Sequence, residues 1–318
     1  MALPNKNLPR LSLVIPIHNE SESIKPLDAE IRKALADMGN PYEVIYVDDG
    51  STDGSLREIR SLKDMKCICL RRNYGQATAL DAGFKAASGD IVVTLDGDGQ
   101  NDPADIPMLV AKMQSAGLDV MVGWRKERCD VRRVRIMTGV GRLLRRALLG
   151  DRIHDSGCTL RAYTKEAVKS LDLGGEMHRY IVAILRLKGF NIGETEVHDR
   201  PRRSGTSNYR SSKAFRGFFD LVYVWFIQKY VGRPIHFFGY VSMFSFAVGV
   251  ASGAFALYSR IADGLSFNRN GWFFLSCFFL LASLFIFSMG VVLDFLIRLH
   301  LNSSPFEKRY YIRETISA

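Results

Sequence analysis

The stretch DIVVTLDGDGQ, residues 90–100, sets the interpretation of the whole chain. Its apolar run has the length of one buried strand, and two carboxylates separated by a single glycine follow at once. At the end of such a strand Asp96 and Asp98 point the same way, so they can share a hard divalent cation with phosphate oxygens and water. The alternative is an ordinary acidic turn, but the placement after a strand favours the metal site.

The residues around this stretch alternate between strand and helix patterns. Strands are predicted over 11–17 (LSLVIPI), 42–47 (YEVIYV), 67–70 (CICL) and 90–95, and helices over 23–38 and 76–87. This alternation, with almost continuously apolar strands, predicts an α/β fold with a mostly parallel sheet covered on both faces. Ligands of such sheets bind beyond the carboxyl ends of the strands, where five acidic residues stand: Glu20, Asp48, Asp49, Asp96 and Asp98.

Two other classes of site are not expected. Neither GxGxxG nor GxxxxGK[ST] occurs, so a nucleotide would not be held by a glycine-rich phosphate loop at a helix N-terminus. The five cysteines are odd in number and show no CxxC spacing. This argues against a zinc site or a disulfide framework, and for a reducing compartment.

Charge is unevenly distributed along the 318 residues. Residues 234–306 contain only three Lys or Arg and two Asp or Glu, and they include two uncharged runs, 235–258 and 271–293. At about 1.5 Å per residue, a helix formed by either run spans the ~30 Å hydrocarbon core of a bilayer. We therefore predict two transmembrane helices, and the alternative of two buried core helices is disfavoured by their length.

Flanking charges predict the orientation of these helices. Basic residues lie before the first run and after the second: Lys229, Arg233, Arg298, Lys308, Arg309 and Arg313. The loop between the runs offers only Arg260 and Arg269. By the positive-inside rule both termini face the cytoplasm. Residues 1–9 lack the apolar segment of a signal peptide.

A basic stretch precedes the membrane runs. Residues 125–152 contain ten Lys or Arg and three Asp or Glu, which gives a net charge of +7. The partner should be anionic, either a nucleic acid, a phosphorylated substrate or an acidic membrane surface, and the apolar runs favour the last two. Residues 131–149 and 212–230 combine basic and apolar side chains at helical spacing. We predict two amphipathic helices in the headgroup plane, although the first would also suit a core.

Four ordered motifs carry a resemblance: VIPIHNE (14–20), VDDGSTDGS (47–55), LRRNYGQATALDAGFKAASGD (70–90) and LDGDGQNDP (95–103). Together they resemble the family-two inverting glycosyltransferases of the GT-A fold. Within that family the chain is similar to the polyprenyl-phosphate branch, above all to the bacterial undecaprenyl-phosphate glucosyltransferases with two C-terminal spans. The resemblance covers essentially the whole chain. It implies a GT-A domain over 1–211, a juxtamembrane helix over 212–233, two spans over 234–300 and a cytoplasmic tail over 301–318.

The resemblance implies roles for residues that match the family motifs. The donor site would consist of Pro16, His18, Glu20, Asp48, Asp49, Gln76, Asp96, Gly97, Arg125 and Asn208. A Mg²⁺ or Mn²⁺ ion would be held by Asp96, Asp98 and Gln100, and Asp98 would also be catalytic. Arg202 matches a diphosphate-clamping arginine in the segment 202–209. Asn208 stands where the family usually has Lys, and His18 stands where Tyr is frequent.

The implied reaction moves a sugar from a nucleotide diphosphate to a polyprenyl phosphate in the inner (plasma) membrane. The metal ion, Arg125 and Arg202 would neutralise the leaving diphosphate. The acceptor oxygen is already anionic, so a general base is optional. Back-side attack inverts the anomeric centre, and an α-linked donor then gives a β-linked product. Asp155 would either orient the acceptor or cap the turn at Ser156.

The acceptor phosphate would be held by Arg132, Arg133 and Arg135. Their alternative role is adhesion to anionic lipid headgroups. The expected partners are a nucleotide sugar, polyprenyl phosphate, the membrane and further copies of the chain, with no nucleic acid. UDP-glucose is the expected donor, and GDP-mannose or a UDP-aminoarabinose is the alternative.

Two other functions fit the sequence less well. A processive polysaccharide synthase would need a Gln-x-x-Arg-Trp motif and more spans, and the sequence has neither. A non-enzymatic lipid-binding scaffold would not need Asp49, Asp96, Asp98 and Arg202 in register. Transfer of labelled sugar to a short lipid, to a polymer or to nothing distinguishes the three functions.

The segment 198–209 lacks apolar periodicity, which predicts a loop that closes over the donor. An arginine that contacts the diphosphate only when the loop closes stabilises the negative charge of the leaving diphosphate in the transition state more than it stabilises the bound donor. Arg202→Ala should therefore lower kcat and kcat/KM together, by about 2–4 kcal/mol of barrier. Arg202→Lys should recover part of the loss. Steady-state kinetics beside the control Arg203→Ala test the role, which is wrong if both Ala variants behave like the wild type.

Overall fold

The computed structural model describes residues 8–36, 38–126, 146, 150, 153–175, 177–201, 221–222, 224–226, 229–230, 234–302 and 312–317. The chain forms two compact units. We call Met1–Val224 with Lys308–Ala318 the sheet unit, and Trp225–Glu307 the hairpin. The amphipathic helix predicted over 131–149 lies outside the described residues, as does most of the one predicted over 212–230.

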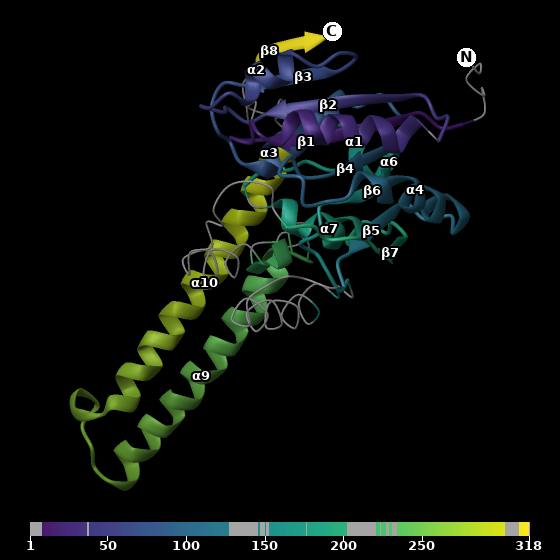
Figure 1. The fold of residues 1–318 in the computed structure, drawn as a ribbon. Coiled ribbons are helices and arrows are strands. Elements are labelled where there is room, and N and C mark those ends of the chain that lie inside the picture. Colours follow the sequence, from purple (N-terminus) through teal and green to yellow (C-terminus); the bar gives the residue numbers. More distant parts are fainter. Residues whose placement is uncertain are drawn as a thin grey trace. The chain divides into compact units, whose positions relative to one another are not determined.

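The sheet unit contains one mixed sheet, drawn in Figure 1. Its described strands are β1 (Leu11–Ile17), β2 (Tyr42–Asp48), β3 (Lys66–Leu70), β4 (Ile91–Thr94), β5 (Val120–Trp124), β6 (Arg161–Thr164), β7 (Ile192–Glu196) and β8 (Ile312–Ser317). The order is β7-β5-β6-β4-β1-β2-β3-β8. Strands β4, β1, β2 and β3 run parallel, as do β5 and β7, whereas β6 and β8 are antiparallel to their neighbours. The predicted α/β fold with a mostly parallel sheet is confirmed.

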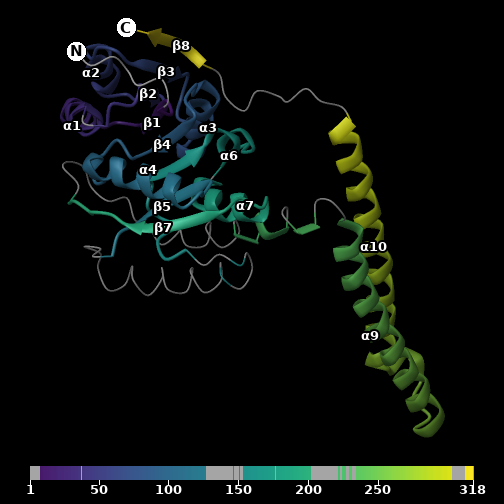
Figure 2. The same ribbon diagram turned by 90° about the vertical axis from the view of Figure 1, so that its right-hand side faces the viewer.

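Helices cover both faces of the sheet. They are α1 (Ile24–Ala36), α2 (Ser55–Arg60), α3 (Gln76–Ala86), α4 (Ile106–Ser115), α6 (Lys165–Lys169) and α7 (Ile181–Leu187), with 3-10 turns η1 (Pro103–Asp105) and η2 (Met177–Tyr180). Figure 2 shows α1 and α4 on one face and α3, α6 and α7 on the other. The predicted strands and the two predicted helices of this unit match the observed ones to within two residues.

The core follows from the two-residue period of β1. Leu11, Leu13, Ile15 and Ile17 point to one face and are at most 1% exposed. There they pack with apolar side chains that recur at helical spacing along α1: Ile24, Leu27, Ile31 and Leu35. Burial of this kind contributes about 1.5–3 kcal/mol for each large aliphatic side chain. The carboxyl end of β1 is therefore held in place by a continuous apolar layer.

Strand β8 is formed by residues that the sequence suggested as a tail. Residues 312–317 pair antiparallel with β3, and Cys67 lies opposite Ile316. Ile316 also packs against the main apolar core. The polar pattern IRETIS gave no clear strand signal in isolation, because an edge strand exposes one face and one edge to water. The chain thus returns from the hairpin to complete the sheet.

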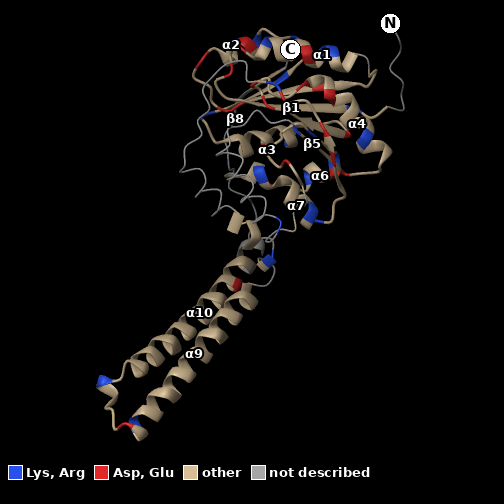
Figure 3. Ribbon diagram, turned by 60° about the horizontal axis from the view of Figure 1, so that its bottom comes forward, with Lys and Arg blue, Asp and Glu red and all other residues tan. Residues whose placement is uncertain are grey.

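The hairpin consists of α9 (Pro234–Ala262), the turn η3 (Phe267–Arg269) and α10 (Gly271–Asn302). Two segments, Pro234–Ala262 and Gly271–Ile297, are long and apolar enough to cross a membrane. Charged residues are almost absent along both helices in Figure 3 and lie mainly near their ends. Because most of their large apolar side chains are exposed, these are not the core helices of a soluble domain.

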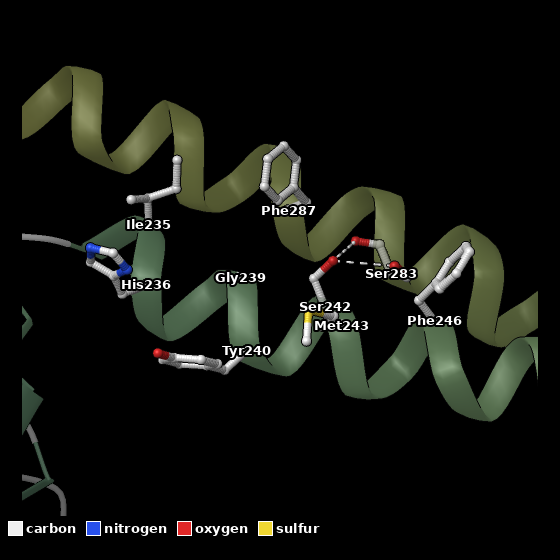
Figure 4. A pocket seen from close by; sticks show the side chains of 9 residues that line it. All are labelled: Ile235, His236, Gly239, Tyr240, Ser242, Met243, Phe246, Ser283 and Phe287. Atoms are coloured by element: carbon white, nitrogen blue, oxygen red, sulfur yellow. Dashed lines mark hydrogen bonds between the residues drawn. The ribbon is translucent and has the colours of Figure 1, made fainter.

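Serine hydroxyls join the two helices across their interface. Ser242 Oγ donates to the carbonyl of Ser283 (3.0 Å), Ser245 Oγ to that of Phe279 (2.9 Å) and Ser276 Oγ to that of Gly249 (2.8 Å). Figure 4 shows Ser242 and Ser283 side by side, next to a groove of about 450 Å³ along α9. Small polar residues let helices approach closely and bond within an apolar solvent.

Aromatic rings gather at the first turn of α9. The ring centroid of Phe237 lies 4.9 Å from that of Tyr230 and 5.3 Å from that of Phe226. Lys229 Nζ lies 5.7 Å from the Trp225 ring centroid. Aromatic and lysine side chains of this kind are typical of a membrane–water interface.

Two tyrosines of β2 provide a test of the packing between β2 and α1. Tyr46 is fully buried, and its hydroxyl donates to Asp28 Oδ1 of α1 (2.9 Å), whereas Tyr42 is only partly buried. Tyr46→Phe leaves the buried Asp28 short of one donor, so we expect a loss of about 1–2 kcal/mol. The thermal midpoint of the detergent-solubilised protein should fall by about 2–8 °C. The control Tyr42→Phe should change the thermal midpoint little. Equal midpoints for the two variants would contradict a stabilising role of the Tyr46–Asp28 hydrogen bond.

Candidate functional site

The carboxyl ends of β1, β2 and β4 surround one pocket. Its cavity volume is about 300 Å³. The lining residues come from these strand ends and from the start of α3: Pro16, Ile17, His18, Glu20, Asp49, Asn73, Gly75, Gln76, Ala79, Asp96, Gly97 and Asp98. This is the edge at which ligands of parallel α/β sheets bind. Four of the five acidic residues expected at this edge, all but Asp48, line the pocket.

The Asp-Gly-Asp turn lies directly under the end of β1. A Cβ atom built on Gly97 would lie 2.3 Å from Ile17 Cδ1 and 3.1 Å from the carbonyl oxygen of Pro16. A larger residue would have to displace the end of the Ile17 side chain and would crowd the Pro16 carbonyl, so the position favours glycine. The Gly97 carbonyl accepts a hydrogen bond from Ser23 Oγ (2.6 Å), which ties the turn to the start of α1. The turn that carries the two carboxylates is thus packed closely against the end of β1.

Both carboxylates of the turn are oriented by neighbours. Asp96 Oδ1 accepts a hydrogen bond from Gln76 Nε2 (2.7 Å), and the Asp96 amide donates to Asn101 Oδ1 (3.1 Å). Asp98 Oδ1 accepts from the amide of Gln100 (3.1 Å). Burial, and then the charge of Asp98, raise the pKa of Asp96 to about 6. A site that disfavours two adjacent negative charges in this way is suited to a cation.

Asp49, at the end of β2, holds the loop before α3. Its two carboxylate oxygens accept hydrogen bonds from the amides of Tyr74 (2.7 Å) and Gly75 (2.8 Å). Burial raises the pKa of Asp49, and these two amides oppose the shift. The Asp49 carbonyl in turn lies 3.0 Å from His18 Nδ1. Asp49 therefore fixes two of the segments that line the pocket.

Asp48 lies outside the lining of this pocket. Its side chain is 3% exposed, and Oδ1 accepts a hydrogen bond from the amide of Ser51 (3.2 Å). Asp48 is the last residue of β2 and Asp49 the first residue after it, and of the two only Asp49 lines the pocket. In the structure Asp48 closes the turn after β2.

Arg125 and Asp155, both predicted site residues, pair with each other. Arg125 Nε donates to Asp155 Oδ2 (2.8 Å), and Nη2 donates to Oδ1 (3.3 Å). Their side chains are only 11% and 3% exposed. Burial opposes the charge of Arg125, but the hydrogen bond and the charge of Asp155 raise its pKa. Asp155 Oδ1 also accepts from the Gly157 amide (3.1 Å), so the capping alternative is present beside the pair.

The predicted residues thus divide into three groups. Those that line the pocket are Pro16, His18, Glu20, Asp49, Gln76, Asp96, Gly97 and Asp98. Those described outside its lining are Asp48, Gln100, Arg125 and Asp155. Those outside the described residues are Arg132, Arg133, Arg135, Arg202 and Asn208. Four lining residues were not predicted, Ile17, Asn73, Gly75 and Ala79, although each lies in one of the motifs that carry the resemblance.

Comparison with known proteins decides the family. Residues 12–172 match the model of the family described as Glycosyl transferase family 2. The chain belongs to glycosyl transferase family 2. The matched range of this glycosyltransferase contains every described residue of the pocket. The resemblance seen in the sequence is confirmed.

Curated relatives of the glycosyltransferase match it along nearly its whole length. A "dodecaprenyl-phosphate galacturonate synthase" of Rhizobium johnstonii is 34% identical, over 96% of this chain and 92% of the relative. An "undecaprenyl-phosphate 4-deoxy-4-formamido-L-arabinose transferase" of Shewanella sediminis is 30% identical, over 98% and 94%. A transferase of the same description from Pseudomonas aeruginosa is 30% identical, over 97% and 91%.

A solved structure shares the fold of the sheet unit. The glucosyl-3-phosphoglycerate synthase of Mycobacterium tuberculosis, in complex with Mn²⁺, UDP and glucosyl-3-phosphoglycerate, aligns with a TM-score of 0.54. It is 22% identical, and the alignment covers 69% of this chain and 80% of that one. At this identity the likeness shows the GT-A fold alone.

The buried Arg125–Asp155 pair can be tested by a double-mutant cycle. Asp155→Ala removes the carboxylate that is hydrogen-bonded to a buried guanidinium and leaves Arg125 with Asp199, whose Oδ1 lies 3.7 Å from Nη1. We therefore expect a loss of about 3 kcal/mol of unfolding free energy. Adding Arg125→Met should restore part of this stability, because the buried guanidinium that lost this carboxylate is removed. Chemical denaturation of the full chain in detergent measures the free energy of unfolding of the wild type, of Asp155→Ala, of Arg125→Met and of the double variant.

The matched control is the neighbouring pair Lys126–Glu196. Its Nζ–Oε1 distance is also 2.8 Å, but the side chains are 62% and 56% exposed. We expect a coupling below about 1 kcal/mol for this pair. If the cycle for Arg125 and Asp155 gave a coupling as small as the control, the inference that Asp155 holds Arg125 would be wrong.

Proposed function

We propose that this glycosyltransferase moves a sugar from a nucleotide diphosphate to a polyprenyl phosphate at a membrane, with inversion at the anomeric carbon. The observation that carries the proposal is the meeting of Asp49, Asp96 and Asp98 in one pocket at the carboxyl edge of the sheet. The family match and the names of the full-length relatives support it. The apolar hairpin supports a substrate that resides in the membrane.

The donor is proposed to be a UDP-linked sugar. Glucose was the sugar expected from the sequence, but the names of the relatives point to galacturonate and to formamido-arabinose. We therefore place donors of these two types before UDP-glucose, with GDP-mannose as the remaining alternative. The bound UDP of the fold neighbour supports uridine as the base.

The residues of the pocket fit a Mg²⁺ or Mn²⁺ ion. Asp96 and Asp98 offer hard carboxylate oxygens, and burial, with the charge of Asp98 as the second cause, raises the pKa of Asp96. No cluster of three or more His, Cys, Asp or Glu side chains suited to a metal occurs among the described residues. The ion would therefore depend on the donor's phosphates for further ligands, and it would supply charge neutralisation to the leaving diphosphate.

The other steps are assigned to side chains of the chain itself. Asp49 holds the wall of the nucleoside pocket through its bonds to Tyr74 and Gly75. Arg125, fixed by Asp155, offers a permanent positive charge, and Arg202 is proposed to close on the diphosphate. The acceptor phosphate attacks with an oxygen that is already anionic, so no side chain is assigned as its base. Arg132, Arg133 and Arg135 are proposed to hold that phosphate.

The hairpin is proposed to anchor the protein in the inner membrane, with both termini in the cytoplasm. The loop between its helices carries few basic residues, whereas basic residues flank both outer ends. The Trp225–Tyr230 aromatic cluster beside Lys229 would mark the cytoplasmic boundary. A polyprenyl phosphate presents its headgroup at this same boundary.

A transfer assay with one substitution tests the proposal. Membranes containing the protein are incubated with polyprenyl phosphate and labelled UDP-galacturonate, UDP-4-deoxy-4-formamido-L-arabinose, UDP-glucose or GDP-mannose. We expect label in a short lipid with one of these donors. Asp98→Asn should lower transfer at limiting Mn²⁺ by at least about 100-fold, because even outer partners of a metal ligand are worth about 10–100-fold. Label in a polymer, or in no product, would contradict the proposal.

Asp102→Asn provides the control for Asp98→Asn. Asp102 lies on the same loop but outside the pocket lining, where it caps η1 and pairs with Arg200. In the transfer assay, Asp102→Asn should depend on the Mn²⁺ concentration as the wild type does. In EDTA, Asp98→Asn should have an equal or higher thermal midpoint, because it relieves repulsion with Asp96. A lower midpoint would show that Asp98 supports the fold itself.

A further inference from the structure

A second, much smaller cavity lies next to Asp96. Its volume is about 10 Å³, the space of one water molecule. It is enclosed by residues of β4, α3, β6 and η2 and of the segments beside them: Pro16, Gln76, Leu80, Thr94, Leu95, Asp96, Thr159, Arg161, Tyr163 and His178. More than half of these residues carry a polar side chain, which is unusual for a gap in a core.

Two buried polar atoms point to a ligand in this cavity. Within the described part of the chain, Tyr163 Oη and His178 Nδ1 are buried and make no hydrogen bond of normal geometry, although Tyr163 interacts electrostatically with the Arg161 guanidinium. Both residues line the cavity, and Tyr163 is 0% exposed. Buried polar groups of proteins are nearly always bonded to protein or to ordered water. The meeting of two such atoms at one water-sized cavity is therefore not a packing accident.

The charges around the cavity suit a neutral ligand. Burial, and then the charges of Arg179 and Arg161, lower the pKa of His178 to about 3, so its imidazole is neutral. Arg161 is 3% exposed, and its guanidinium donates to the carbonyls of Cys158 (2.7 Å) and Ser156 (2.6 Å). Asp96 is part of the same lining. Water can donate to the carboxylate and bond the imidazole and the phenol at the same time.

We propose that this cavity holds one ordered water molecule, which joins Tyr163 Oη and His178 Nδ1 to the carboxylate of Asp96. Tyr163 and His178 are then positioning residues for Asp96, acting from the side opposite the donor pocket. Gln76 already holds Asp96 Oδ1 from α3, and the water adds a second support from β6 and η2. Partners of this kind fix the orientation of a carboxylate that binds a metal. The cavity and its two buried polar atoms are sufficient to infer the water site, whereas the effect of the water on metal binding rests on the proposed function.

The experiment compares two fully buried tyrosines. Tyr163→Phe removes a hydroxyl from the cavity, and Tyr46→Phe removes one that bonds Asp28 far along the sheet. The affinity for UDP is measured by calorimetry at several Mn²⁺ concentrations, on the full chain in detergent, together with the thermal midpoint. We expect Tyr163→Phe to weaken Mn²⁺-dependent UDP binding about tenfold. Tyr46→Phe should leave that affinity unchanged while lowering the midpoint.

His178 provides an independent pair of variants. His178→Leu removes the polar atom and should weaken binding like Tyr163→Phe, whereas His178→Asn places a polar atom near Nδ1 and should restore part of the affinity. Wild-type Mn²⁺ dependence in Tyr163→Phe and His178→Leu would overturn the positioning role. A crystal structure with no ordered water between Tyr163 Oη and His178 Nδ1 would overturn the site. Failure of the wild type to bind UDP with Mn²⁺ would instead contradict the proposed function, and the crystallographic result would still decide the water site.

Discussion

Repulsion between carboxylates at one edge of the sheet is the constraint on which the site depends. Parallel β1, β2 and β4 all end at the same edge, so Asp49, Asp96 and Asp98 are forced into one pocket. Each is compensated differently. Asp49 is held by two backbone amides and Asp96 by a glutamine amide, and burial, followed by the charge of Asp98, raises the pKa of Asp96. The apolar layers behind the strands keep the carboxylates close together, and a cation bound between Asp96 and Asp98 would offset their repulsion.

Local signals allowed much of this arrangement to be predicted from sequence. The strands were visible because apolar runs of strand length are bounded by polar turns, and the Asp96-Gly97-Asp98 turn was visible because it follows one of them. Which of the neighbouring side chains Asp48 and Asp49 faces the pocket was not predicted. In the structure only Asp49 lines it, and which of the two does so depends on packing against α1 and α3.

Contacts between segments that are far apart in the sequence could not be predicted from local sequence patterns. Arg125 and Asp155 stand 30 residues apart, and each was assigned a separate task, whereas the structure pairs them through two hydrogen bonds. Tyr163 and His178 carried no motif signal, because a four-residue strand, RAYT, and a short 3-10 turn gave no reason to connect them. Asn73 and Gly75 were missed for another reason, since they reach the pocket only because Asp49 holds their loop.

Strand β8 has a consequence for how the protein is made. The residues that cover the edge of β3 follow α10 in the chain, so they are synthesised after both apolar helices. Until then a nascent sheet unit exposes the unpaired backbone of β3, which other strands can bind. Completion of the sheet therefore waits until both apolar helices have been translated. A chain whose synthesis stopped before residue 312 would keep this edge of β3 open.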